Sequence, residues 1–171
     1  MTASSAPEVW LRGPLPDFPP ELMPVAHALL QAREEIDRVT AGLSDAQLWR
    51  SPGGVAPPGF HLKHIAGSLD RLISYAQGVP LSPARRSALA SEQTVGIPAT
   101  AREAAGLVHR SIDTALAVLR AWDPGTLGME RRVGTAGLPS TSRGLLFHAA
   151  EHTARHVGQL VTTVLVLKCE V

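Results

Sequence analysis

The chain has 171 residues, enough for one domain with a buried core, and its 16 Lys and Arg nearly balance its 15 Asp and Glu. That balance leaves no basic stripe for nucleic acid, and no apolar run is long enough to span a bilayer. One cysteine, Cys169, and the absence of an apolar secretory signal near the N-terminus predict a soluble cytoplasmic protein that binds neither nucleic acid nor membrane.

The first half of the chain contains two segments with helical periodicity. Residues 1–22 are expected to form a surface arm, since prolines and glycines interrupt residues 13–24. A first helix is predicted from about Pro24 to Gly42, and a second from about Pro58 to Gly78. In both segments, apolar residues recur every three or four positions.

The second half of the chain also contains two long segments with helical periodicity. The connection at 78–98 contains "SPARRSALASE", which is rich in helix formers and predicts one short helix. A third long helix is predicted to begin at Thr100, where Glu103 completes a capping box, and to end at "DPG". "MERRVGTAGL" is the one candidate for a short hairpin, and a fourth long helix is predicted to begin near residues 140–142 and to continue to Lys168.

Four amphipathic helices, each longer than the average of about 11 residues, predict an all-α fold. We expect a four-helix bundle with long connections between helices 2 and 3 and between helices 3 and 4. The whole chain, residues 1–171, is expected to be a single domain.

Histidines are concentrated on the second and fourth predicted helices. His148, His152 and His156 are spaced four apart, and residues at this spacing are neighbours on one helix face. Either adjacent pair can share a metal ion, provided that another helix completes the coordination. The second helix offers His61 and His64, and His64 lies among apolar positions.

The alternative interpretation is that these histidines are hydrogen-bonded core residues, as we expect for the isolated His27 and His109. Burying several unpaired imidazoles costs about 1–3 kcal/mol each unless something satisfies them. A metal ion would satisfy them together. The spacing alone does not choose between the two pairs on the fourth helix.

"HAAEHTARHVGQL" resembles the C-terminal helix motif of the DinB-like superfamily of four-helix-bundle metalloenzymes, in which HxxxH is closely followed by Gly-Gln and an aliphatic residue. "GFHLKHIAGSLDRLISYA" is similar to the family's second-helix segment, and "LSDAQLWRSP" to the turn before it. The resemblance extends over residues 24–168. It implies that His64, His152 and His156 are the metal ligands, because the tail that begins at Gly158 follows His156.

This chain also departs from the family pattern. His61 and His148 are additional histidines, and Arg155 stands where many relatives have a further histidine. A role in supporting the ligands, a role in binding substrate, and a shifted ligand register all stay open for the additional histidines. The family's metals are divalent zinc, nickel, iron or manganese, and imidazole suits several of them.

Three neutral imidazoles leave a divalent ion its full charge and open coordination positions. Such an ion polarises a bound oxygen, lowers the pKa of bound water to about 7, or binds a thiolate. The resemblance implies a metal-dependent enzyme, with thiol-dependent S-transferases and isomerases among the family's activities. A small-molecule substrate and a low-molecular-weight thiol are then the expected partners.

Other functions stay open beside this one. They are a metal-dependent hydrolase, a stress-related metal-binding protein without turnover, and a helical dimerisation module whose histidines belong to the core. Gln159 either orients a ligand or faces solvent, and Asp70, Glu103 and Asp113 lie at no spacing that marks a general base. The fourth helix is apolar almost all round beyond Gln159, which predicts a homodimer.

Overall fold

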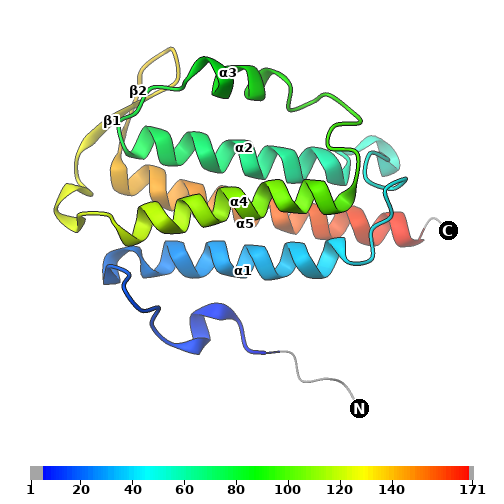
Figure 1. Cartoon of the computed structure of the whole chain (residues 1–171), viewed down its shortest axis with the longest axis horizontal. Coiled ribbons are helices and arrows are strands. Elements are labelled where there is room, and N and C mark those ends of the chain that lie inside the picture. The colour runs from blue at the N-terminus through cyan, green and yellow to red at the C-terminus, as the bar shows by residue number, and fades with distance from the viewer. Residues whose placement is uncertain (1–5, 170–171) are drawn as a thin grey trace.

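The computed structural model describes residues 6–169, which are mostly helical (Figure 1). The helical class predicted from the periodicity is confirmed, with a small two-stranded sheet in addition. The α-helices are α1 (Met23–Thr40), α2 (Pro58–Ala76), α3 (Pro83–Ala90), α4 (Ala101–Arg120) and α5 (Ser142–Cys169). The strands are β1 (Glu130–Val133) and β2 (Leu138–Thr141), and short 3-10 helices are η1 (Val9–Arg12), η2 (Pro20–Leu22), η3 (Pro52–Gly54) and η4 (Pro124–Thr126).

Four of the helices are long and lie side by side, whereas the short α3 lies outside them over α2 (Figure 1). Helix α2 packs against α4 and α5, and α1 packs against the same two helices. No helix within the described part of the chain is long and apolar enough to cross a membrane.

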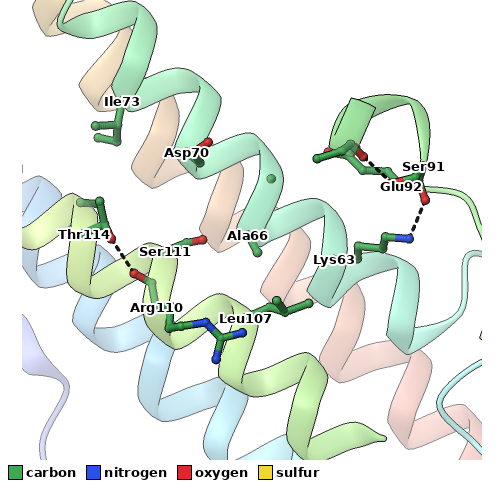
Figure 2. A pocket seen from close by; sticks show the side chains of 13 residues that line it. Lys63, Ala66, Asp70, Ile73, Ser91, Glu92, Leu107, Arg110, Ser111 and Thr114 are labelled. Carbon is green, nitrogen blue, oxygen red and sulfur yellow. Dashed lines mark hydrogen bonds between the residues drawn. The ribbon is translucent and has the colours of Figure 1, made fainter. Parts of the chain in front are cut away.

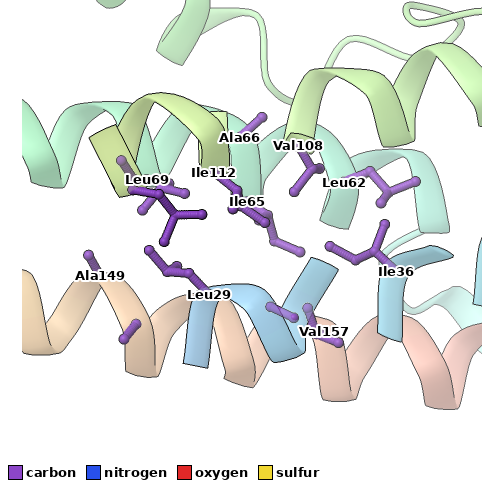
Figure 3. Packing of buried hydrophobic residues seen from close by; sticks show 14 of the residues in the cluster. Leu29, Ile36, Leu62, Ile65, Ala66, Leu69, Val108, Ile112, Ala149 and Val157 are labelled. Carbon is purple, nitrogen blue, oxygen red and sulfur yellow. The ribbon is translucent and has the colours of Figure 1, made fainter. Parts of the chain in front are cut away.

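The interior is filled by aliphatic side chains from all four long helices (Figure 3). Leu29 of α1, Ile65 of α2 and Ile112 of α4 are completely buried, as is Ala149 of α5. Burial of one such leucine or isoleucine stabilises the fold by about 1.5–3 kcal/mol. This apolar interior fixes the relative positions of α2 and α5, which carry the histidine segments.

The start of α4 follows the capping signal in the sequence. The Thr100 side chain accepts a hydrogen bond from the Glu103 backbone at 3.1 Å, and the Glu103 carboxylate accepts one from the Thr100 backbone at 3.3 Å. These bonds satisfy backbone donors that the first helical turn leaves without a partner.

The expected hairpin forms, but its second strand continues to Thr141, beyond the end of "MERRVGTAGL" at residue 138. The two strands are antiparallel, with Glu130 opposite Thr141 and Val133 opposite Leu138. Gly134 and Gly137, with φ of 67° and 61°, allow the tight connection. Because β2 takes residues 138–141, α5 begins at Ser142, at the end of the predicted range for its start.

The N-terminal segment that begins at residue 6 packs along the side of α1. The backbone amide of Val9 donates to the Gln31 side chain at 3.0 Å, and Arg12 pairs with Glu34 at 2.5 Å. The Val9 side chain is buried. Residues 1–5 of the expected arm lie outside the described residues.

Candidate metal centre

Two helices bring the candidate ligands together. His64 lies on α2, and His152 and His156 lie one turn apart on α5. A ligand nitrogen from each of the three rings can be chosen so that all lie within 4.8 Å of one another. Within residues 6–169, the structure therefore places these histidines close enough to hold one metal ion.

The facing nitrogen atoms are suitable for metal binding. Nε2 of His64 lies 2.9 Å from Nε2 of His152. The ring centroid of His156 lies 4.5 Å from that of His64 and 4.6 Å from that of His152. A tetrahedral zinc ion with Zn–N bonds near 2.1 Å separates its ligand nitrogens by about 3.4 Å, so a small outward movement of the rings would admit it.

His148 does not join this set. Its side chain is 49% exposed, and its Nδ1 lies 3.3 Å from a carboxylate oxygen of Glu151 on the same helix. Its ring centroid is 5.3 Å from that of His152. This geometry favours the pair His152 and His156, which the resemblance implied, over the shifted register.

His61, which lies on α2 like His64, contacts the cluster through His156. It is 4% exposed, and its Nδ1 lies 3.2 Å from Nδ1 of His156. The His61 ring also donates a hydrogen bond to the Ala56 backbone. Because Nδ1 of His61 faces His156, the nitrogen that donates to Ala56 is Nε2. A neutral imidazole that donates through Nε2 accepts through Nδ1, so His156 donates its Nδ1 proton to His61 and keeps the Nε2 lone pair free.

Glu92 supports the ligand on α2. Its carboxylate Oε2 accepts a hydrogen bond from Nδ1 of His64 at 2.7 Å, and its Oε1 is paired with Arg71. The ring of Phe60 stacks on the ring of His64, with an interplanar angle of 11°. The carboxylate and the aromatic ring together fix the orientation of the His64 imidazole.

The environment of His61, His152 and His156 favours neutral imidazoles. Burial, followed by the neighbouring His64, His152 and His61, lowers the pKa of His156 to about 4. Burial is also the main cause that lowers the pKa of His152 and the pKa of His61. Neutral imidazole is the form that binds metal, so protons should compete little with a metal ion at His152 and His156 near neutral pH.

Opposing causes act on Glu92. Burial works to raise the pKa of its carboxyl group, but the hydrogen bonds from His64 and Arg71 outweigh burial and leave the pKa below its usual range. Glu92 is therefore an anion at neutral pH and accepts hydrogen bonds from both partners.

Other residues considered in the sequence have partners elsewhere. His27 contacts the Gly13 carbonyl at 3.1 Å, and His109 lies 2.9 Å from Asp37. Gln159 is exposed, in keeping with the solvent-facing one of its two interpretations. The three acids named as weak candidates have structural contacts: Asp70 pairs with Arg85, Asp113 with Arg33, and Glu103 caps α4.

Glu92 and Arg71 were not among the site residues predicted from the sequence. Glu92 lies in an irregular connection, where no periodicity indicates which way a side chain points. One signal was present: Gly67 interrupts the middle of α2, where glycine is unfavourable without a packing reason.

The donor set fits a divalent ion. Two of the three imidazoles have an outer hydrogen-bond partner at Nδ1, which leaves Nε2 of each as the coordinating atom. Nδ1 of His152 is buried and without a hydrogen-bond partner among the described residues. Three neutral nitrogen ligands with open positions beside them are typical of catalytic sites for zinc and similar metals.

Comparisons with known proteins identify the family of the chain. The sequence pattern of the DinB superfamily matches residues 28–160, a range that includes all three candidate ligands. No curated protein matches the chain.

Two solved structures share the fold. A conserved protein from Enterococcus faecalis is 19% identical with a TM-score of 0.63, and the match covers 85% of this chain and 95% of that one. A DinB-like protein from Bacillus cereus is 20% identical with a TM-score of 0.57, covering 79% and 87%. Since the superfamily pattern spans more than half of the sequence, the chain belongs to the DinB superfamily.

Proposed function

We propose that the four long helices form a DinB-type four-helix bundle in which His64, His152 and His156 bind one divalent metal ion. The observation that carries this proposal is the convergence of three imidazoles within 4.8 Å. Zinc, nickel, iron and manganese all suit imidazole ligands. Elemental analysis of protein purified without a histidine tag tests the proposal directly, and protein without stoichiometric divalent metal after metal reconstitution would contradict it.

We further propose that the site supports transfer of a low-molecular-weight thiol to a small electrophile, or isomerisation through such a thiol. When bound, a divalent ion with neutral ligands supplies positive charge that favours an anionic guest such as a thiolate. The protein's part is to keep three nitrogens unprotonated at Nε2 or Nδ1 and directed at one point. For two of the three rings, His61 and Glu92 do this by accepting the Nδ1 protons of His156 and His64.

The approach to the cluster along α5 is polar. His148 and Arg155 both contact Glu151, and the side chains of His148 and Arg155 are 49% and 54% exposed. His148 and Arg155 lie within about one turn of His152 along α5, so we infer that they hold a polar substrate near the cluster. They support binding and do not by themselves identify a reaction.

A cobalt-substituted protein distinguishes thiol chemistry from the alternatives. Titration with a low-molecular-weight thiol is expected to produce an intense sulfur-to-metal charge-transfer band. Because the exposed Cys169 could give the same signal, the experiment belongs in a Cys169→Ser background. If the metal stays bound and no thiol tested gives a band, the proposal moves to a metal-dependent hydrolase or to a stress-related metal-binding protein without turnover.

The homodimer stays a prediction. Helix α5 exposes three large apolar side chains, Phe147, Leu165 and Val166, at 67%, 57% and 44%. Such exposure along one helix supports an interface between two copies of the chain.

A further inference from the structure

The segment between α2 and α4 is unusual in what it buries. Residues 77–100 include α3, yet α3 has no buried residue, and the segment buries only Glu92 and Pro98. Connections of this length within a compact domain commonly have a function. Glutamate is almost never buried without a partner, so the burial of Glu92, 6% exposed, requires an explanation.

Polar contacts with one face of α2 hold this segment in place. Lys63 donates from Nζ to the Ser91 carbonyl at 2.5 Å (Figure 2). Asp70 forms a two-point pair with Arg85, at 2.6 and 2.8 Å. Arg71 pairs with Glu92. Counted from position 63, the other three positions of these contacts, 67, 70 and 71, lie four, seven and eight residues further along α2. These spacings put all four positions on one helical face.

Gly67 provides the space in which Glu92 lies. A Cβ atom at this position would stand 2.5 Å from Oε1 of Glu92 and 2.9 Å from Nη1 of Arg71. Glycine weakens a helix interior, and here it admits the ion pair against the α2 backbone. The lysine, the glycine, the aspartate and the arginine of this face therefore all serve the placement of one carboxylate.

We propose that Glu92 is a positioning residue for the metal centre. Carried by the segment 77–100 and held over Gly67 by Arg71, its carboxylate keeps the proton of His64 on Nδ1 and the Nε2 lone pair directed at His152. The metal-binding part of this inference rests on the proposed function, whereas the tautomer part does not.

The physical reason lies in the two states of a neutral imidazole. Either nitrogen can carry the single proton, and without an acceptor at Nδ1 both tautomers are populated. A carboxylate at 2.7 Å from Nδ1 selects the tautomer that has a free lone pair on Nε2. It also makes the ring a stronger ligand and prevents its rotation.

The first experiment measures the tautomer of His64 in metal-free protein by nitrogen-15 NMR of the histidine rings. The native chain is expected to hold the Nδ1–H form. Glu92→Ala is expected to give a mixture of both forms, whereas Glu92→Gln, whose amide oxygen still accepts a hydrogen bond, should keep the Nδ1–H form. An unchanged His64 tautomer in Glu92→Ala would overturn the proposal.

The second experiment measures zinc affinity by competition with a chelator. Glu92→Ala is expected to weaken zinc binding about 10–100-fold, the usual effect of removing an outer hydrogen-bond partner. Glu92→Gln should lose less, and Glu130→Ala, at an exposed glutamate on β1, should lose nothing. Equal affinities of Glu92→Ala and the native chain would contradict the positioning role.

Gly67→Ala provides an independent variant should Glu92→Ala fail to fold. Its added methyl group would displace the carboxylate without removing it, and alanine favours the helix. Weakened zinc binding with a mixed His64 tautomer, and without loss of thermal stability, is the expected result; native tautomer and affinity would count against the proposal. If the native chain binds no zinc yet its His64 tautomer depends on Glu92, the proposed function fails and the positioning of His64 stands.

Discussion

The histidines of α1 and α4 differ from those at the contact of α2 and α5 in what satisfies their ring nitrogens. His27 contacts a backbone carbonyl at 3.1 Å, and His109 lies 2.9 Å from the carboxylate of Asp37. Each is a single ring with a protein acceptor close by. Nothing in either environment directs several free lone pairs at one point.

At the contact of α2 and α5, the rings face one another. His64 and His152 approach through Nε2 at 2.9 Å, a pair in which at most one nitrogen can donate if both rings are neutral. The acceptors supplied by the protein, Glu92 and His61, lie at the outer nitrogens of His64 and His156. The histidines of α1 and α4 each have one separate protein contact, whereas the rings at the contact of α2 and α5 face one another and have their partners at the outer nitrogens. This placement of the partners distinguishes the candidate metal centre from isolated histidines.

Alanine substitutions should separate the two groups most strongly. Replacement of His64, His152 or His156 removes a ligand and is expected to lower zinc affinity by more than about 100-fold. His27→Ala and His109→Ala should leave zinc affinity within about twofold of native, because their partners lie elsewhere. Competition titration and elemental analysis measure both effects.

Two outcomes would break this comparison. Equal loss from all five variants would mean that the substitutions act through folding and not through ligation. A large loss from His148→Ala together with none from His156→Ala would restore the shifted register.

The free energy of unfolding of the metal-free protein should depend on pH, and this expected effect is smaller than the loss of zinc affinity. Burial and the neighbouring histidines lower the pKa of His156 from 6.5 to about 4 in the folded, metal-free protein. Between these values the unfolded chain binds more protons than the folded chain, so stability is lost as pH falls from 6.5 toward 4. At pH 5 the contribution of His156 to this loss should be about 1 kcal/mol after allowance for the partial exposure of the ring.

Urea unfolding at pH 7 and pH 5 tests this expectation. His156→Gln should reduce the difference between the two pH values, because glutamine does not titrate, and the part that remains comes from His61 and His152, whose pKa values burial also lowers. His109→Gln serves as the control and should keep the native difference. The same difference in His156→Gln as in the native chain would remove His156 as its source.

Local signals explain how much of the fold could be predicted. The capping box at Thr100 and Glu103 fixes the start of α4, because both groups lie within one turn and need no distant partner. The periodicity of α2 and α5 likewise gives their apolar faces. The hairpin was less certain, since its register depends on how β2 leads into α5.

The site was predictable only where it lies on regular helices. His152 and His156 share a face by their spacing, and the resemblance added His64. Glu92 was missed because it reaches His64 through a connection without periodicity, 28 residues away along the chain. Its position depends on contacts of Lys63, Asp70 and Arg71, which exist only once the segment 77–100 has folded over α2.

His148 offers the smallest and sharpest test of the comparison. It lies on α5 one turn before His152, yet its side chain is 49% exposed and its Nδ1 faces Glu151 at 3.3 Å. Its partner is thus a protein carboxylate, as for His109, although its position in the sequence groups it with the cluster. Because removal of an exposed, weakly paired group has little effect on its surroundings, His148→Ala should change zinc affinity by less than about threefold. Chelator competition at neutral pH resolves a change of this size, and a tenfold loss would place His148 among the groups that hold the metal.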